Sequence, residues 1–389
     1  MRRLSIFCGA AQTRGLLQDN DRNIDLFFGP SIYDSLDDQP PPIGSIIVGR
    51  VLRKAPGFRG AFIDIGGSVD AFLSIKKSGK SPDEGAIACF KLNRHASGQK
   101  GPVVEVVERD TLQASDKKPG NILERPTLLQ AMVSRVRDLE EIYIDNTEAI
   151  PLLPPLEKSM TNIGIPNEIY NACKDQIGQS LSRTIVIAGG GRVIFDETEG
   201  PTIIDIDGSN INRSANRASR SINYAAASLV MSEIKMREIG GRVVVDFLPP
   251  SSAKDKEDLV SLLKCEAKIL PGVRLGRLQS DGLFDFTLPK LGPSLLEQAT
   301  EKVNDGFVRD GLELSDHWIA QGLVFEIERR LKFGSSSLML EAMISEKLKE
   351  GVFAKNPQWT KRISERYGLR IKFTVGHALN DWDYELHEG

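Results

Sequence analysis

The sequence predicts a mixed α/β fold built from several domains, and three observations support this prediction. The chain has 389 residues, which is enough for about two to four domains of ordinary size. Short β-type runs separated by glycine fill residues 44–110, whereas strand and helix patterns alternate between residues 120 and 290. Proline clusters at residues 40–42, 151–155 and 249–250 separate these blocks, because proline fixes its own φ and donates no hydrogen bond to a sheet.

The composition is that of an ordinary globular protein, with 40% hydrophobic and 26% charged residues. The formal net charge is −3, so a nucleic-acid ligand would need a local basic or aromatic surface. The cysteines form no CxxC pair, and we expect reduced thiols at Cys8, Cys89, Cys173 and Cys265. No apolar run reaches the roughly 18 residues of a membrane-spanning helix, and the first residues turn polar too soon for a signal peptide. We therefore expect a cytoplasmic protein without membrane attachment.

Residues 44–110 form the first predicted unit, a small β-barrel. Its predicted strands lie at residues 46–52, 60–65, 71–75 and 103–107. Strand alternation places Phe62 and Phe72 on the polar side of this barrel, where exposed rings can stack on RNA bases at about 1–3 kcal/mol per base. The alternative is that both rings cover the barrel flank or a domain contact. Nearby basic residues that could meet phosphates are Lys76, Lys77, Lys80, Arg94 and Lys100.

The α/β part of the chain follows from patterns on both sides of the barrel. An opening strand covers residues 1–8, and residues 185–247 alternate strand, strand, helix, strand. Residues after about 300 show a mixed α/β pattern with more charged residues. The predicted helices are 127–139, 166–182, 214–238 and 255–265, and the other predicted strands are 141–144, 202–208, 242–247 and 282–287.

Residues 202–208 are the most informative stretch, a strand of buried character that contains Asp205 and Asp207. Because side chains alternate along a strand, these two acids point to the same face. The helix at 214–238 leads to a second apolar strand that is closed by Asp246, and this order predicts two parallel strands of a βαβ unit. Parallel neighbours are about 4.8 Å apart, so carboxylates near their carboxyl ends can share one Mg²⁺ ion.

Such a magnesium site would support phosphodiester hydrolysis, in which the ion polarises a phosphoryl oxygen and lowers the pKa of a bound water. In-line attack would leave a 5′-phosphate and a 3′-hydroxyl. Acids at strand ends also serve as helix caps and turn formers, and the same pair would suit another two-carboxylate hydrolase or transferase. Arg213, Arg217 and Arg220 share one face of the predicted helix, where they could hold phosphates or form a solvated surface.

Taken together, these segments resemble the bacterial ribonuclease E/G family. The resemblance covers roughly residues 1–300 with gaps. It rests on Gly60-Ala61-Phe62-Ile63-Asp64-Ile65-Gly66, on Ala71-Phe72-Leu73, on Gly190-Gly191-Arg192-Val193-Ile194-Phe195-Asp196 with the strand 202–208, on Arg237-Glu238-Ile239-Gly240-Gly241, and on Gly282-Leu283-Phe284-Asp285-Phe286-Thr287. It implies a ribonuclease H-like subdomain in 1–43 and 116–182, an inserted OB-fold RNA-binding domain in 44–115, a deoxyribonuclease I-like catalytic subdomain in 183–300, and a small C-terminal α/β domain in 301–389.

The resemblance also implies a magnesium-dependent endoribonuclease that cuts single-stranded RNA in RNA processing or decay. Asp205 and Asp246 fall on the family's two magnesium-binding aspartates. Asp207 stands where the family commonly has an asparagine that orients one of them, so it could tighten metal binding or act as a third ligand. The implied catalytic acids are therefore Asp205, Asp246 and Asp207. The implied RNA-binding residues are Phe62, Phe72 and Lys100.

Three features depart from the family pattern. The Arg-Thr signature of 5′-monophosphate sensing is missing between residues 110 and 125, which argues against 5′-end sensing. Residues 295–330 contain no cysteine, so we expect neither zinc nor a zinc-linked dimer. The basic run after Thr287 is reduced to Leu288-Pro289-Lys290. These losses leave a rival hypothesis, an RNA-binding protein of the same fold with weak or no turnover. A metal-dependent hydrolase of another phosphate ester is a more distant rival.

Overall fold

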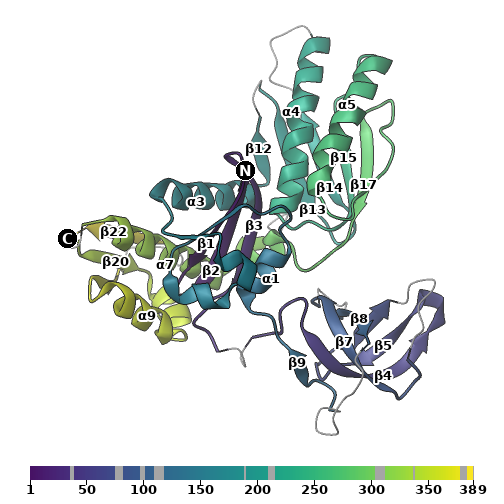
Figure 1. Ribbon diagram of the computed structural model, residues 1–389. Helices are drawn as coiled ribbons and strands as arrows, with labels where there is room; N and C mark the ends of the chain where they lie inside the picture. The colour runs from purple at the N-terminus through teal and green to yellow at the C-terminus, as the bar shows by residue number, and fades with distance from the viewer. Residues whose placement is uncertain are drawn as a thin grey trace. The chain divides into compact units, whose positions relative to one another are not determined.

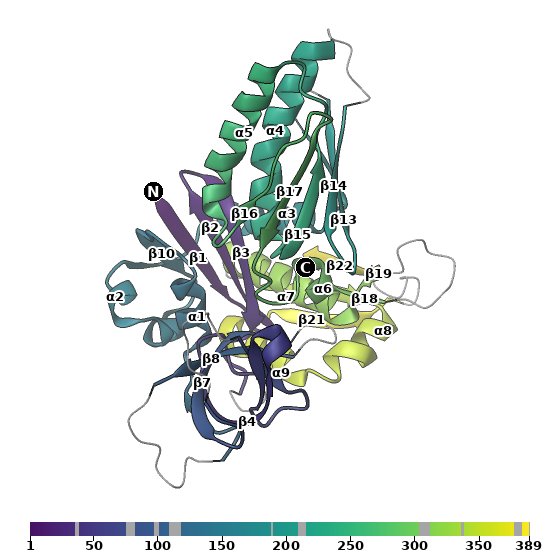
Figure 2. The ribbon, with the colours of Figure 1, turned by 90° about the vertical axis from the view of Figure 1, so that its right-hand side faces the viewer.

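The computed structural model describes residues 1–35, 39–74, 82–96, 101–108, 118–187, 190–208, 215–302, 312–335, 338–376 and 383–388. They form two compact units with mixed α/β structure, which confirms the predicted fold class (Figure 1, Figure 2). The first unit contains Met1–Gln39, Val136–Gly178 and Leu296–Gly389, and the second contains Pro40–Arg135 and Gln179–Leu295. Across the described residues, no helix combines the length and the apolar character needed to span a membrane.

A five-stranded mixed sheet with the order β11-β10-β1-β2-β3 is the centre of the first unit. β1 pairs with β2 antiparallel and with β10 parallel, so the start of the chain lies beside residues that follow the barrel. The buried ring of Phe7 contacts Tyr170 of α3 (Asn167–Leu181) and Phe325 of α7 (Asp316–Phe333), with ring centroids 4.6 and 5.6 Å apart. The strands are β1 (Arg2–Cys8), β2 (Gln12–Asp19), β3 (Arg22–Pro30), β10 (Glu141–Ile144) and β11 (Thr161–Ile163).

The C-terminal residues belong to the same unit. Their sheet places β20 between β21 and β22, and their hydrophobic core includes Ala10 and Ala11 from the turn after β1. The boundary predicted at residue 301 remains a prediction, and the structure adds that the residues after it share a core with the N-terminal strands. The C-terminal elements are β20 (Leu340–Ile344), α8 (Glu346–Leu348), η6 (Lys349–Phe353), α9 (Pro357–Tyr367), β21 (Ile371–Val375) and β22 (Tyr384–Glu388).

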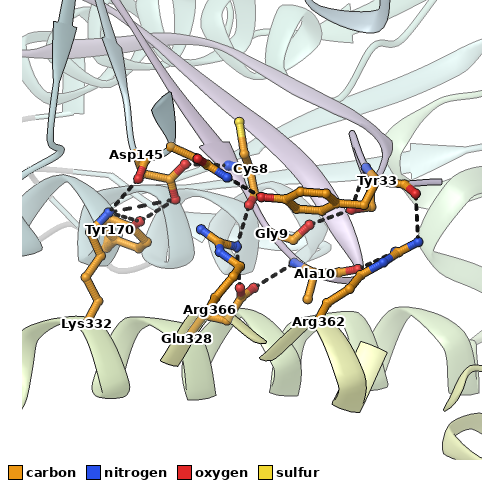
Figure 3. A network of polar contacts seen from close by, with 12 residues as sticks. Cys8, Gly9, Ala10, Tyr33, Asp145, Tyr170, Glu328, Lys332, Arg362 and Arg366 are labelled. Carbon is orange, nitrogen blue, oxygen red and sulfur yellow. Dashed lines mark hydrogen bonds and ion pairs between the residues drawn. The ribbon is translucent and has the colours of Figure 1, made fainter. Parts of the chain in front are cut away.

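A buried polar network joins the C-terminal helices to the ends of the parallel strands β1 and β10 (Figure 3). Asp145, directly after β10, accepts hydrogen bonds from the Cys8 backbone N–H at 2.8 Å and from the Tyr170 hydroxyl at 2.6 Å. Lys332 of α7 donates to that hydroxyl at 3.2 Å, and its ammonium lies 4.0 Å from the Asp145 carboxylate. Three positive or hydrogen-donating groups therefore compensate the buried charge of Asp145.

Glu328 and Arg366 form the other half of this network. Arg366 of α9 donates to the Glu328 carboxylate at 2.6 Å and to the Cys8 carbonyl at 2.7 Å. Glu328 also accepts a hydrogen bond from the Ala10 backbone N–H at 2.9 Å. Burial raises the pKa of Glu328 to about 7, although Arg366 and the Ala10 hydrogen bond act in the opposite direction. The carboxyl end of β1 is therefore held by side chains of α7 and α9.

The second unit contains a β-barrel that closes in the order β4-β5-β6-β8-β7 and back to β4. β6 and β8 are parallel, and β9 (Ile122–Glu124) extends the sheet beside β4. Its interior is filled by alternating apolar residues such as Val51, Ile63 and Phe90. The barrel strands are β4 (Ile46–Ala55), β5 (Gly60–Asp64), β6 (Ala71–Ser74), β7 (Ile87–Arg94) and β8 (Val103–Val107).

The second unit also contains a six-stranded sheet with the order β12-β13-β14-β15-β17-β16. Helices α4 (Ala215–Met236) and α5 (Ala253–Glu266) pack on one face, where Ile204, Val245 and Ala226 share a core. β14 and β15 are parallel and are connected through α4, which confirms the predicted βαβ unit. The strands are β12 (Thr184–Val186), β13 (Arg192–Glu197), β14 (Thr202–Asp207), β15 (Gly241–Asp246), β16 (Arg274–Leu275) and β17 (Leu283–Leu288).

Two helix ends differ from the prediction. α1 (Leu128–Ser134) begins at a capping box of Thr127 and Gln130 but ends before residue 139, and Asp138 adopts a φ of 53° that cannot continue a helix. α4 ends at Met236, before the predicted end at residue 238, because Glu238 takes a left-handed φ of 52°. The remaining elements are η2 (Pro56–Phe58), η4 (Thr147–Leu152), α2 (Pro155–Lys158), η5 (Ala267–Ile269), α6 (Leu295–Ala299), β18 (Thr300–Lys302) and β19 (Leu312–Leu314).

Candidate active site

The predicted acids lie in the six-stranded sheet of β12 to β17, on the face opposite helices α4 and α5. Every second residue of β14 is buried, and the residues between them include the exposed Asp205 and the partly buried Asp207. Asp246 is the exposed last residue of β15. Asp205 and Asp246 are direct partners in the parallel register. The structure therefore brings the predicted pair together at the carboxyl end of these strands, on a face that helices α4 and α5 leave open.

The carboxylates on this open face act on one another. Partial burial raises the pKa of Asp205 above its ordinary value, and repulsion from Asp246, Asp207 and Asp196 raises it further. In the described part of the chain, neither Asp205 nor Asp246 forms an ion pair with a cationic side chain. Two adjacent carboxylates without a countercharge are stabilised by a cation, so the electrostatics of the pair suit a bound metal ion.

Asp207 is different, because it has an arginine partner that the sequence reasoning missed. Arg192 of β13 is the register partner of Asp207. The Arg192 Nε donates to Asp207 Oδ2 at 3.2 Å, and a terminal guanidinium nitrogen donates to the same oxygen. A usable signal was present, because an antiparallel hairpin that turns at residues 198–201 places Arg192 opposite Asp207.

The other aspartates beside the pair also have arginine partners. Arg183 donates two hydrogen bonds to Asp196 of β13, at 2.6 and 2.9 Å. On the opposite side, Arg242 of β15 lies 3.9 Å from Asp285 of β17. The acids that flank Asp205 and Asp246 are thus neutralised, while the central pair is not.

The donor set fits a hard divalent cation. The described residues contain no group of three His, Cys, Asp or Glu side chains arranged to hold a metal ion. The candidate ligands are therefore the carboxylates of Asp205 and Asp246. Mg²⁺ commonly takes one or two carboxylates, keeps several waters and binds substrate phosphate, so two oxygen donors on an open face are sufficient.

One member of the predicted arginine stripe can be placed, and it lies away from this face. Arg220 donates to Asp255 and Asp258 of α5 at 2.9 and 3.0 Å, and it lies 5.2 Å from the Tyr224 ring. It therefore links the two helices on the other side of the sheet. The side chains of Arg213 and Arg217 fall outside the described residues.

The barrel brings the two predicted phenylalanines together. Phe62 and Phe72 are register partners on β5 and β6, with ring centroids 5.6 Å apart at an interplanar angle of 70°. The guanidinium of Arg53 lies 4.5 Å from the centroid of the Phe62 ring. The Phe72 ring lies against Gly60, where a Cβ atom would come within 2.1 Å of it. Both rings are partly exposed and form one aromatic surface with a cation beside it.

Most of the predicted basic residues of the barrel cannot be placed. Lys76, Lys77, Lys80 and Lys100 lie outside the described residues. Arg94 is described, and it donates to the Gly101 carbonyl at 3.2 Å, so one of its nitrogens serves the barrel backbone.

Comparison with protein families gives a match over the middle of the chain. The model of the Ribonuclease E/G family matches residues 103–269. This region contains β14, α4 and β15, and therefore both Asp205 and Asp246.

Curated proteins with similar sequences carry related names. A putative ribonuclease E of Buchnera aphidicola subsp. Baizongia pistaciae is 26% identical over 186 residues, which is 44% of this chain and 44% of that protein. Ribonuclease E of Synechocystis sp. is 29% identical over 124 residues, or 31% of this chain and 18% of that protein. Ribonuclease E of Escherichia coli is 23% identical over 228 residues, or 52% of this chain and 21% of that protein. The matched regions span less than half the length of each of these relatives.

Proposed function

We propose that the chain is a member of the ribonuclease E/G family, whose model matches residues 103–269, and that it is an endoribonuclease that hydrolyses single-stranded RNA. One observation supports this proposal most directly. Asp205 and Asp246 are register partners on the open face, inside the matched region, and are without a cationic partner among the described residues. Cleavage would leave a 5′-phosphate and a 3′-hydroxyl.

Asp205 and Asp246 would hold a Mg²⁺ ion, because they supply the oxygen donors and the uncompensated negative charge that this ion requires. When bound, the ion supplies Lewis-acid polarisation of the scissile phosphate and a water of lowered pKa. The protein contributes a rigid placement of both carboxylates, since each lies on a strand of the same sheet. We assign no role to zinc.

The barrel is the proposed RNA-binding element. Its ring order, with the third and fifth strands parallel, supports an OB-fold, whose second and third strands commonly bind oligonucleotides. Phe62 and Phe72 lie on those two strands. Arg53, beside the Phe62 ring, adds a positive charge that would attract the RNA backbone. Lys100 remains a predicted contact.

The finer domain assignment is part of this proposal. The sheet around β1 and β10 would be the ribonuclease H-like subdomain that the barrel interrupts, and the sheet around β14 and β15 would be the deoxyribonuclease I-like catalytic subdomain. The parallel pairing of β1 with β10 supports an interrupted subdomain, because the strands before and after the barrel lie side by side. A cytoplasmic role in RNA processing or decay is proposed with it.

The rival is an RNA-binding protein of the same fold without turnover. The reduced basic run at Leu288-Pro289-Lys290 does not decide between the two, because Leu288 pairs with Gly241, at the end of β15 away from Asp246. A cleavage assay separates the two. Wild type should cut a short single-stranded RNA in Mg²⁺, and EDTA or Asp205→Asn should abolish cutting. Asp175→Asn, at an exposed position of α3, is the matched control and should cut normally. RNA binding without cleavage by wild type would support the rival instead.

A further inference from the structure

The open face of the second sheet has a regular arrangement of charge. Its aspartates are Asp196, Asp205, Asp207, Asp246 and Asp285. Each of the three outer aspartates has an arginine partner. Arg183, directly before β12, pairs with Asp196, Arg192 of β13 pairs with Asp207, and Arg242 of β15 pairs with Asp285. In the part of the chain that the structure describes, the register partners Asp205 and Asp246 have none. The arginines therefore separate the acids into neutralised ones and a free central pair.

Asp207 is the acid for which this separation matters most. It lies two residues after Asp205 on the same strand face, so its carboxylate is close enough to raise the pKa of Asp205. Without a partner it would be a third negative oxygen donor beside the cation. The Asp207 side chain is 22% exposed and the Arg192 side chain 44%, so the pair lies at the surface with its carboxylate on the inner side.

The position of Arg192 allows it to orient the Asp207 carboxylate. It projects from the register position opposite Asp207, and two of its nitrogens donate to Oδ2. Two donors on one oxygen fix the orientation of the carboxylate, and the guanidinium also neutralises its charge. An asparagine would be neutral without any partner, whereas an aspartate is neutral in effect only while the arginine is present.

We infer that Arg192 is a positioning residue that holds Asp207 out of the cation site, so that Asp205 and Asp246 alone bind the ion. The inference rests on the proposed function. An ordinary surface ion pair would contribute at most about 1 kcal/mol to stability, and breaking it would add no ligand to a cation at the neighbouring residues. The two explanations therefore differ in what they predict for metal binding.

The test measures binding of Mn²⁺ alone to the full chain by titration calorimetry, together with RNA cleavage. The proteins are wild type, Arg192→Ala, Asp207→Asn, the double variant and Asp205→Asn. Arg220→Ala is the matched control, because it removes an arginine that pairs with aspartates on the helical side of the same sheet. Thermal unfolding of every variant verifies that it is folded.

The expected change in Mn²⁺ affinity follows from the net charge of the Arg192–Asp207 pair in each variant. Arg192→Ala leaves one uncompensated negative charge and should tighten Mn²⁺ binding by roughly five-fold, the scale of one near-surface charge. Asp207→Asn leaves one positive charge and should weaken binding by a similar factor. The double variant is neutral again and should bind within roughly two-fold of wild type. Arg192→Ala should also cut RNA roughly ten-fold more slowly at saturating metal, because a third carboxylate takes a position that water or phosphate needs.

Unchanged Mn²⁺ affinity in Arg192→Ala, or effects of the two single changes that fail to cancel in the double variant, would overturn the role of Arg192. Failure of the proposed function looks different. In that case Asp205→Asn would bind Mn²⁺ as well as wild type does, or wild type would bind none at all.

Discussion

At the scale of single residues, Asp205 is surrounded by other carboxylates that repel its charge. The pKa of this carboxyl is raised by partial burial and by Asp246, Asp207 and Asp196. A fold gains nothing from placing adjacent carboxylates in register without a countercharge, so the arrangement costs stability unless a ligand compensates it. This is the pattern expected of a binding site, where local preference is sacrificed for function.

Asp205→Asn should therefore stabilise the metal-free protein while it removes cleavage. The amide keeps the shape of the carboxylate but relieves the repulsion, by less than about 1 kcal/mol because the group is exposed to solvent. Urea unfolding in EDTA measures the effect, and Asp175→Asn is the control for a change in net charge. A lower free energy of unfolding in Asp205→Asn would mean that the carboxylate has a structural role.

The partly exposed ring of Phe72 should contribute to RNA binding by stacking on one base. Phe72→Leu keeps an apolar side chain against Gly60 but removes the aromatic face, so RNA binding should weaken by roughly ten-fold, the loss of one stacked base. Fluorescence anisotropy with a short single-stranded RNA measures this. Leu52→Ala, at an exposed position of β4, is the control and should bind as wild type does. Equal affinity for Phe72→Leu would return the ring to a packing role.

At the scale of elements, the network between β1, β10, α7 and α9 responds to pH through Glu328. Glu328 is buried beside Arg366 and the Ala10 N–H, and Asp145, Lys332, Cys8, Tyr33, Tyr170 and Tyr367 surround the pair. Burial raises the pKa of Glu328 from 4.5 to about 7. The folded state therefore holds this proton more tightly than the unfolded state does.

The sign of the effect follows from that difference. The stabilisation is fully present below pH 4.5 and is lost as the pH rises to about 7, at a cost of at most roughly 3 kcal/mol. Wild type should lose free energy of unfolding between pH 5 and 7 relative to Glu328→Gln, which cannot titrate. Urea unfolding at several pH values measures the difference in slope, and Glu365→Gln on the exposed side of α9 is the control. Parallel curves for wild type and Glu328→Gln would contradict a raised pKa.

At the scale of the whole molecule, the sequence predicted what depends on local order and missed what depends on distant pairing. Strand alternation and the order strand, helix, strand were enough to place Asp205 beside Asp246. The pairing of Arg192 with Asp207 required the hairpin register as well. The contact of Glu328 with Arg366 and Ala10 had no signal in the sequence, because residues from both ends of the chain meet there. The end of α4 was mislocated because Glu238, a residue without special preference, adopts the left-handed conformation.

Because the chain ends meet in the first unit, this unit should need the C-terminal residues in order to fold. The core around Ala10 and Ala11 is completed by residues after 316, and the Phe7 ring packs on Phe325. A chain that stops at residue 300 would expose this apolar surface and leave Asp145 without Lys332. Since a buried charge without partners and a lost core are both costly, the first unit should not fold in the truncated chain.

Hydrogen exchange measures separately whether each unit of the truncated chain is folded. In the truncated chain, the amides of β1 and β10 should lose their protection, whereas those of β14 and β15 should keep it, because their core lies within residues 185–288. Co-expression of residues 301–389 as a separate chain should restore protection in β1, since the core and the network then have their missing halves. If β1 and β10 stay protected without the C-terminal residues, those residues form an independent domain, and the shared core contributes little to the stability of the first unit.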